Sequence, residues 1–169
     1  MPYFKMIVSF NGKDFYGFQY QPNLPTVQGE IEKALEKITG VKTRIIPAGR
    51  TDTGVHAKSL PIIADIETHL DAIVLFKALN AILGKNIRIL SVDERTNPSF
   101  HPRFSAQKRR YCYYISLIDD PFGEGMYWRI RHKLDLCAIK RELPNLLGKR
   151  DFSSFTVGRY DNPYWRDSG

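Results

Sequence analysis

The hydrophobic and polar positions in the first two thirds of the chain predict four strands. At 3–10, a run of aromatic and β-branched residues stops at Asn11 and Gly12, which is typical of a strand that enters a turn. Three similar runs predict the remaining strands, at 43–48, 59–67 and 87–93.

Two helices are expected between these strands. Thr26 is placed to cap a helix whose apolar positions recur at helical spacing as far as Gly40. The segment 68–71 has the spacing of a capping box, and the apolar helix that follows is expected to close at Gly84. The resulting order, β-α-β-β-α-β, is the split βαβ arrangement, in which two helices pack on one face of a mostly antiparallel sheet. We therefore predict an α+β fold.

The last third of the chain starts the same pattern again. A strand is expected at about 109–117, followed by a turn at 119–123. A helix is then expected over about 135–147, interrupted by Pro144, and it precedes an aromatic segment at 151–155.

We accordingly expect two domains. Residues 1–105 form an N-terminal α+β domain, and residues 106–169 form a partial second one that lacks the later strands and helix of the first. An incomplete sheet leaves an unpaired edge and an uncovered apolar face. A second copy of the chain would cover both, so a homodimer is expected.

Composition narrows the class of protein. Of the 169 residues, 43% are hydrophobic and 25% are charged, which is an ordinary globular mixture. No apolar stretch approaches the ~18–20 residues that cross a bilayer, and the first residues lack the pattern of a secretory signal. The two cysteines, Cys112 and Cys137, predict neither a disulfide framework nor a zinc site. We therefore expect a cytoplasmic protein without a membrane partner.

Charge adds a candidate partner. The chain has 25 Lys and Arg against 18 Asp and Glu, and its formal net charge of +7 favours binding to nucleic acid. The cations gather in two stretches, 95–110 and 129–150, and several aromatic residues lie close to them: Phe100, Phe104, Tyr111, Tyr113, Tyr114, Tyr127 and Trp128. These rings are either stacking surfaces for RNA bases or packing residues on one face of a strand.

One polar segment between two predicted strands is a candidate site for chemistry. Two glycines at 49 and 54 let the backbone approach a ligand, and Arg50 stands two residues from Asp52. On composition alone, the commoner interpretation is a polar loop with Asp52 as a turn former. The alternative is a carboxylate that a neighbouring arginine keeps ionised, able to attack or shelter a sugar centre. The four histidines are widely spaced, and none is our candidate general base.

The segment around Asp52 resembles the signature of the tRNA pseudouridine synthase A family. It consists of Gly49, Arg50, Thr51, Asp52, Thr53, Gly54, Val55, His56 and Ala57. Six further stretches resemble the family in the same order along the chain: 14–19, 26–30, 78–81, 100–106, 110–113 and 151–155.

The resemblance implies a function and assigns roles to residues. Asp52 would be the catalytic nucleophile, Arg50 would displace or replace the target base, and Tyr111 would stack on the flipped uracil. Thr51 and Arg110 complete the implied substrate-binding set. The family isomerises uridines at positions 38 to 40 of the tRNA anticodon stem-loop, as a homodimer with neither cofactor nor metal. Attack at C1′, attack at C6 and proton removal from C2′ remain alternative uses of the carboxylate.

The chain also departs from the family. Thr53 replaces the usual alanine, and the Met-Val-Arg motif, whose arginine is expected to pair with the catalytic aspartate, does not occur. The runner-up hypothesis is therefore a truncated RNA-binding remnant that is catalytically weak or inactive. A third hypothesis is a split βαβ interaction module, but it leaves the Asp52 segment unexplained.

Overall fold

A computed structural model describes residues 3–94 and 100–155 of the chain. Arg95, one of the cations noted above, and the last residues of the chain, 156–169, lie outside the described residues. The chain divides into two compact units, which are treated separately here: unit 1 is Met1–Tyr114 with Pro121–Trp128, and unit 2 is Ile115–Asp120 with Arg129–Gly169. The domain division at 105 and 106 stays a prediction.

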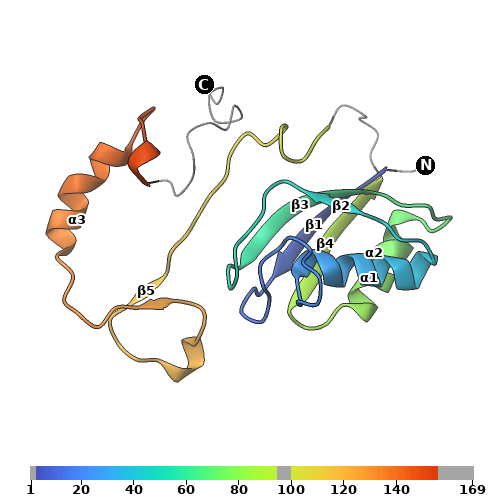
Figure 1. The fold of residues 1–169 in the computed structure, drawn as a ribbon, viewed down its shortest axis with the longest axis horizontal. Helices are drawn as coiled ribbons and strands as arrows, with labels where there is room; N and C mark the ends of the chain where they lie inside the picture. Colours follow the sequence, from blue (N-terminus) through green and yellow to red (C-terminus); the bar gives the residue numbers. More distant parts are fainter. Residues whose placement is uncertain (1–2, 95–99, 156–169) are drawn as a thin grey trace. The chain divides into compact units, whose positions relative to one another are not determined.

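Unit 1 contains a four-stranded antiparallel sheet (Figure 1). Its strand order is β2-β3-β1-β4. The strands are β1 (Tyr3–Phe10), β2 (Ile45–Pro47), β3 (Ala57–Asp65) and β4 (Ile87–Glu94). The four strands confirm the elements that the hydrophobic runs predict, and β1 lies in the middle because it pairs with both β3 and β4.

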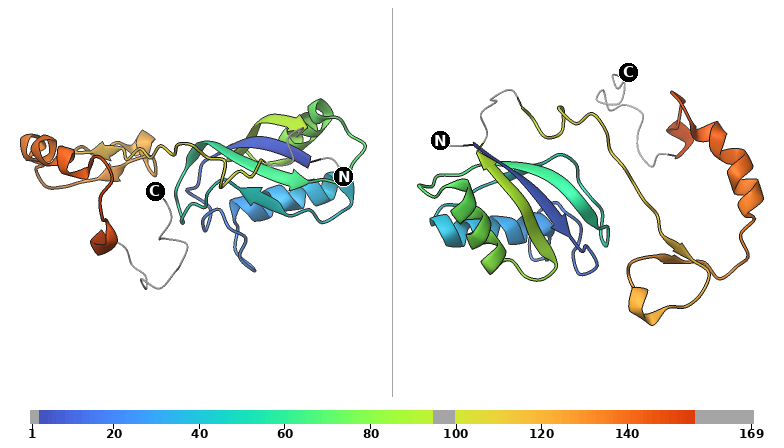
Figure 2. Two further views of the ribbon diagram at one scale, coloured as in Figure 1. Left: turned by 90° about the horizontal axis from the view of Figure 1, so that it is seen from above. Right: turned by 180° about the vertical axis from the view of Figure 1, so that it is seen from behind.

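Helices α1 (Val27–Thr39) and α2 (Ala72–Ile82) cover one face of this sheet (Figure 2). Alternate side chains of β1 are buried beneath them, from Phe4 to Phe10. In α1, Ile31 and Leu35 are fully buried in the same core. The split βαβ arrangement and the α+β class are therefore confirmed.

The helix ends agree with the sequence at α1 and differ at α2. Thr26 accepts a hydrogen bond from the Gly29 amide, and Gly40 ends α1 in the left-handed conformation, as expected. The capping box expected over 68–71 does not form, because Asp71 is the cap of α2 and accepts from the Val74 amide at 2.8 Å. Leu83, in extended conformation, ends α2 in place of Gly84.

The strand predicted at 109–117 is wrong for most of its length. Only β5 (Ile115–Ser116) is a strand, in a two-stranded sheet with β6 (Trp128–Arg129), and residues 106–114 have no regular secondary structure. A segment rich in β-branched and aromatic residues forms a strand only where a neighbouring strand hydrogen-bonds to its backbone N–H and C=O groups. No described strand pairs with 106–114.

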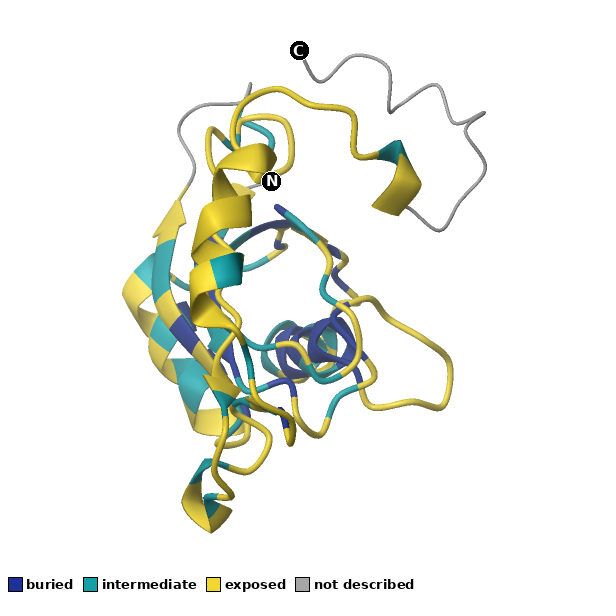
Figure 3. Ribbon diagram, turned by 90° about the vertical axis from the view of Figure 1, so that its left-hand side faces the viewer, coloured by how far each residue is buried: buried dark blue, intermediate teal, exposed yellow. Residues whose placement is uncertain are grey.

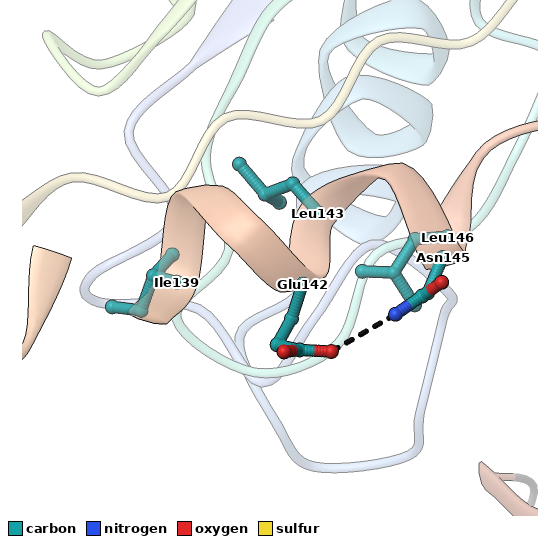
Figure 4. A pocket seen from close by; sticks show the side chains of 5 residues that line it. All are labelled: Ile139, Glu142, Leu143, Asn145 and Leu146. Carbon is teal, nitrogen blue, oxygen red and sulfur yellow. Dashed lines mark hydrogen bonds between the residues drawn. The ribbon is translucent and has the colours of Figure 1, made fainter. Parts of the chain in front are cut away.

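Unit 2 contains short elements with little buried surface. Helix α3 (Leu136–Glu142) is capped by Asp135, and the turn η2 (Leu143–Leu146) follows it at the predicted proline interruption. Of the described residues of this unit, only Ile130 is buried. Helix α3 and η2 together hold a pocket (Figure 4) lined by Ile139, Glu142, Leu143, Asn145 and Leu146.

Candidate active site

Asp52 lies in the connection between β2 and β3. Strand β2 ends at Pro47 and β3 begins at Ala57, which leaves residues 48–56 as an irregular segment, here called the Asp52 loop. At its start, the Ala48 amide donates to the carbonyl of Pro61 at 2.8 Å and so extends the strand pairing by one residue. Within it, the Val55 amide donates to the Asp52 carbonyl at 3.2 Å and closes a turn. The two strands therefore hold both ends of the loop.

A second loop, the segment 12–18, supports the Asp52 loop from one side. The Phe18 amide donates to the Thr51 carbonyl at 2.9 Å, and the Gly54 amide donates to the Phe15 carbonyl at 3.3 Å. Phe18 is fully buried, and its ring lies 6.0 Å from that of Phe10 in the core. The loop that carries the aspartate is thus fastened to the core through a separate part of the chain.

Gly17 makes this close approach of the two loops possible. Its φ is +81°, and a Cβ atom at this position would lie 2.8 Å from the Thr51 carbonyl oxygen. Only glycine combines that backbone conformation with that contact.

His56 connects the Asp52 loop to two further segments. Its Nδ1 accepts a hydrogen bond from the Gly12 amide at 3.0 Å, and its Nε2 lies 2.8 Å from the Gly125 carbonyl oxygen. Because Nδ1 is an acceptor, the ring proton is on Nε2, which donates to Gly125. The His56 ring therefore links the Asp52 loop to the segments that contain Gly12 and Gly125.

The carboxylate of Asp52 is open to solvent. Asp52 and Arg50 are both exposed, and no hydrogen bond or ion pair among the described residues engages either side chain. Beside them, the Thr51 hydroxyl is buried without a hydrogen-bond partner among the described residues. The loop backbone is fixed, while its two charged side chains remain free to meet a ligand.

The remaining predicted site residues come from the segment 106–114. Arg110 and Tyr111 are exposed, the latter at 76%, and no hydrogen bond or ion pair in the described ranges ties either to Asp52. Their neighbour Arg109 does reach the loop, because its Nη2 donates to the Ala48 carbonyl at 3.2 Å and to the Arg103 carbonyl at 3.1 Å. The sequence argument missed Arg109 as a loop contact, although it directly precedes the Arg110 and Tyr111 motif.

Five of the seven aromatic rings proposed as stacking surfaces are exposed. They are Phe104, Tyr111, Tyr113, Tyr114 and Trp128. Cations accompany some of them: Arg103 lies over the Phe104 ring at 5.9 Å from its centroid, and Lys58 lies over the Tyr114 ring at 5.9 Å. For these five rings, the interpretation as core residues is wrong, and their accessible faces suit base stacking.

The ranges 3–94 and 100–155 contain neither a cluster of metal-ligating side chains nor a helix that could span a membrane. No three His, Cys, Asp or Glu side chains gather there in a way that could hold a metal ion. None of the helices in those ranges has the length and apolar character needed to span a bilayer.

Comparison with known proteins gives clear relatives, although no model of a protein family matches the chain. The chain is 47% identical over 152 residues to tRNA pseudouridine synthase A of Borreliella burgdorferi, a match that covers 88% of this chain and 61% of the relative. It is 41% identical over 162 residues to tRNA pseudouridine synthase A of Listeria innocua, covering 94% of this chain and 65% of the relative. The relative of the same name from Borrelia duttonii is 41% identical over 154 residues. The chain thus spans about three fifths of the length of the curated relatives that it matches.

Proposed function

Because the chain is homologous to the tRNA pseudouridine synthase A proteins, we propose that it is an RNA-modifying isomerase that converts uridine to pseudouridine in tRNA. The target is the anticodon stem-loop, at positions 38 to 40. Asp52 is the catalytic nucleophile, Arg50 takes the place of the displaced base, and Tyr111 stacks on the flipped uracil.

The reaction requires the protein mainly to hold the substrate and the reacting side chains in the correct positions. The N1–C1′ bond of uridine breaks and a C5–C1′ bond forms, while the proton leaves C5 and N1 gains one, so that the product is an isomer of the substrate. Its central requirement is an anionic oxygen at the sugar and a surface that holds the detached uracil. The accessible Asp52 carboxylate and the exposed Tyr111 ring suit these two tasks.

The observation that carries the proposal is how the Asp52 loop is held. Its backbone is anchored by Phe18 and Phe15 of the neighbouring loop and its His56 side chain by Gly12, yet the carboxylate itself is left without a partner in the described ranges. A turn former normally uses its oxygens on its own backbone. The fixed loop backbone and the accessible carboxylate leave Asp52 open to a bound nucleoside.

The partner, assembly and location follow from the same relationship. tRNA would bind through the exposed cations and rings around Arg103 and Lys58, so we expect affinity to fall as salt concentration rises. We further propose that the active form is a homodimer in the cytoplasm.

The test is release of tritium from tRNA labelled at C5 of uracil. We expect Asp52→Asn, which keeps the shape but removes the charge, to lower the release rate by about 10³-fold or more. The matched control is Asp65→Asn, at another exposed aspartate, in β3, and we expect it to change the rate less than about threefold.

Two results would contradict the proposal. Undiminished release from the Asp52 variant would remove its catalytic role. Salt-sensitive binding of tRNA without any release from the unchanged chain would identify an RNA-binding remnant instead.

A further inference from the structure

The two residues that flank the 49–57 signature both contact one segment of the chain. Ala48, just before the loop signature, accepts a hydrogen bond from Arg109 at 3.2 Å. Lys58, just after it, donates to the Tyr114 hydroxyl at 3.4 Å and lies over the Tyr114 ring. Tyr111 lies between these two attachment points in the sequence. The segment 109–114 is therefore fastened at one end to the first residue of the Asp52 loop and at the other to β3.

We propose that Arg109 is a positioning residue of the active site, whose guanidinium fastens the segment that carries Arg110 and Tyr111 to the root of the Asp52 loop. This inference rests on the function proposed above. It adds a role for a residue whose charge alone would suggest only a phosphate contact.

The geometry of the guanidinium supports this role. A single nitrogen, Nη2, donates to the carbonyls of both Ala48 and Arg103. Arg103 belongs to a compact turn in which the Ser105 amide donates to the His101 carbonyl at 2.8 Å and Pro102 is buried. Arg109 thus joins two loops by one planar group.

Other means of holding the segment are few. Residues 106–114 form no strand and no helix, and the backbone hydrogen bond recorded for them, from the Trp128 amide to the Tyr114 carbonyl at 2.7 Å, holds only the last of these residues. The Arg109 side chain forms no ion pair with a carboxylate among the described residues, so its charge is directed at backbone carbonyls. A charged donor bound to a carbonyl forms a stronger hydrogen bond than a neutral one. Removing the Arg109 guanidinium should therefore make both the Asp52 loop and the turn that contains Arg103 more mobile.

The first experiment measures amide hydrogen exchange and needs no catalytic activity. In Arg109→Gln, we expect the amides of Ala48 and Ser105 to exchange about tenfold faster than in the unchanged chain. The matched control is Lys108→Gln, which removes the same charge one residue earlier from an exposed side chain with no contact to the loop. We expect it to leave both amides unchanged. Equal exchange in the two variants would overturn the proposal.

The second experiment measures kcat and KM. It distinguishes a positioning role of Arg109 from the loss of one positive charge. Both variants lose one cation, so both should raise KM for tRNA by a similar factor. Only Arg109→Gln should also lower kcat, by about 10- to 100-fold, because a displacement of about 1 Å at the reacting groups has an effect of that size. Arg109→Lys should recover part of kcat, since an ammonium can reach one carbonyl.

The outcomes are distinct from those of the proposed function. Equal kcat values in Arg109→Gln and Lys108→Gln would overturn the positioning role even if Asp52 proves essential. If the unchanged chain releases no tritium, the proposed function fails, and the exchange comparison alone decides whether Arg109 fastens the segment.

Discussion

Two helices of this protein carry apolar residues at helical spacing but have opposite surroundings. In α1 of unit 1, Ile31 and Leu35 are completely buried against the sheet. In α3 of unit 2, Leu136 and Ile139 stand at a comparable helical spacing but are 59% and 44% exposed. Figure 3 shows the contrast, with α1 mainly in the buried and intermediate colours and α3 largely in the exposed one.

The difference lies in what each helix packs against. Helix α1 faces a four-stranded sheet, whose inward side chains supply the other half of a core. The described part of unit 2 offers α3 no comparable sheet face. Apolar spacing therefore identifies a helix, while burial depends on a complementary surface elsewhere in the chain or in a partner.

The largest expected effect separates the two helices directly. Leu35→Ala removes a fully buried side chain, and we expect it to lower the free energy of unfolding by about 2–5 kcal/mol. Leu136→Ala removes an α3 side chain that is 59% exposed, and we expect a loss below about 1 kcal/mol. Thermal unfolding followed by circular dichroism measures both. Equal losses would mean that the α3 side is covered in solution, and the contrast between the units would disappear.

A smaller effect concerns two glycines with the same backbone angle. Gly17 and Gly148 both have φ of +81°, but only at Gly17 would a Cβ atom meet a close neighbour. We expect Gly17→Ala to destabilise unit 1 by about 1–3 kcal/mol, because strain in the backbone adds to the contact with Thr51.

The control for that experiment is Gly148→Ala, which introduces the backbone strain in open space. It should leave the unfolding midpoint of unit 1 unchanged, since Gly148 belongs to unit 2. Denaturant unfolding followed at the buried amides of β1 distinguishes the two variants. A shift of the same size in both would show that the units unfold as one.

The smallest expected effect concerns an ion pair in unit 2. Arg129 donates to Asp119 at 2.7 Å, and this hydrogen bond, together with the charge of Arg129, lowers the pKa of the Asp119 carboxyl. A lowered pKa in the folded state contributes stability above the ordinary carboxyl pKa, and this contribution disappears as the pH falls through the folded pKa. Asp119 is 76% exposed, so the contribution to stability should be slight.

Carboxyl titration by NMR checks this prediction. Arg129→Gln should raise the pKa of Asp119 towards its ordinary value. Asp151 serves as the internal reference, because hydrogen bonds from Ser153 hold its pKa low independently of Arg129. An unchanged Asp119 titration would contradict the assigned cause.

The strands and helices of unit 1 were predictable because each follows from local chemistry. Alternating side chains of β1 and the threonine cap of α1 specify their elements over a few residues. The prediction failed at 109–117, where a strand-like composition met no partner strand. It also placed the cap of α2 at Thr68, because Thr and Asp both suit a cap and only the course of the chain selects Asp71.

The candidate site divides in the same way. Asp52 and Arg50 are candidate site residues because their short segment resembles a family signature, whereas its composition alone favours a turn former. The contacts of Gly17 with Thr51 and of Arg109 with Ala48 join residues that lie far apart in the chain. Such contacts arise only when packing of the core brings distant loops together. The sequence therefore indicates which residues of the loop are candidates for chemistry, while the tertiary structure determines which residues hold the loop in place.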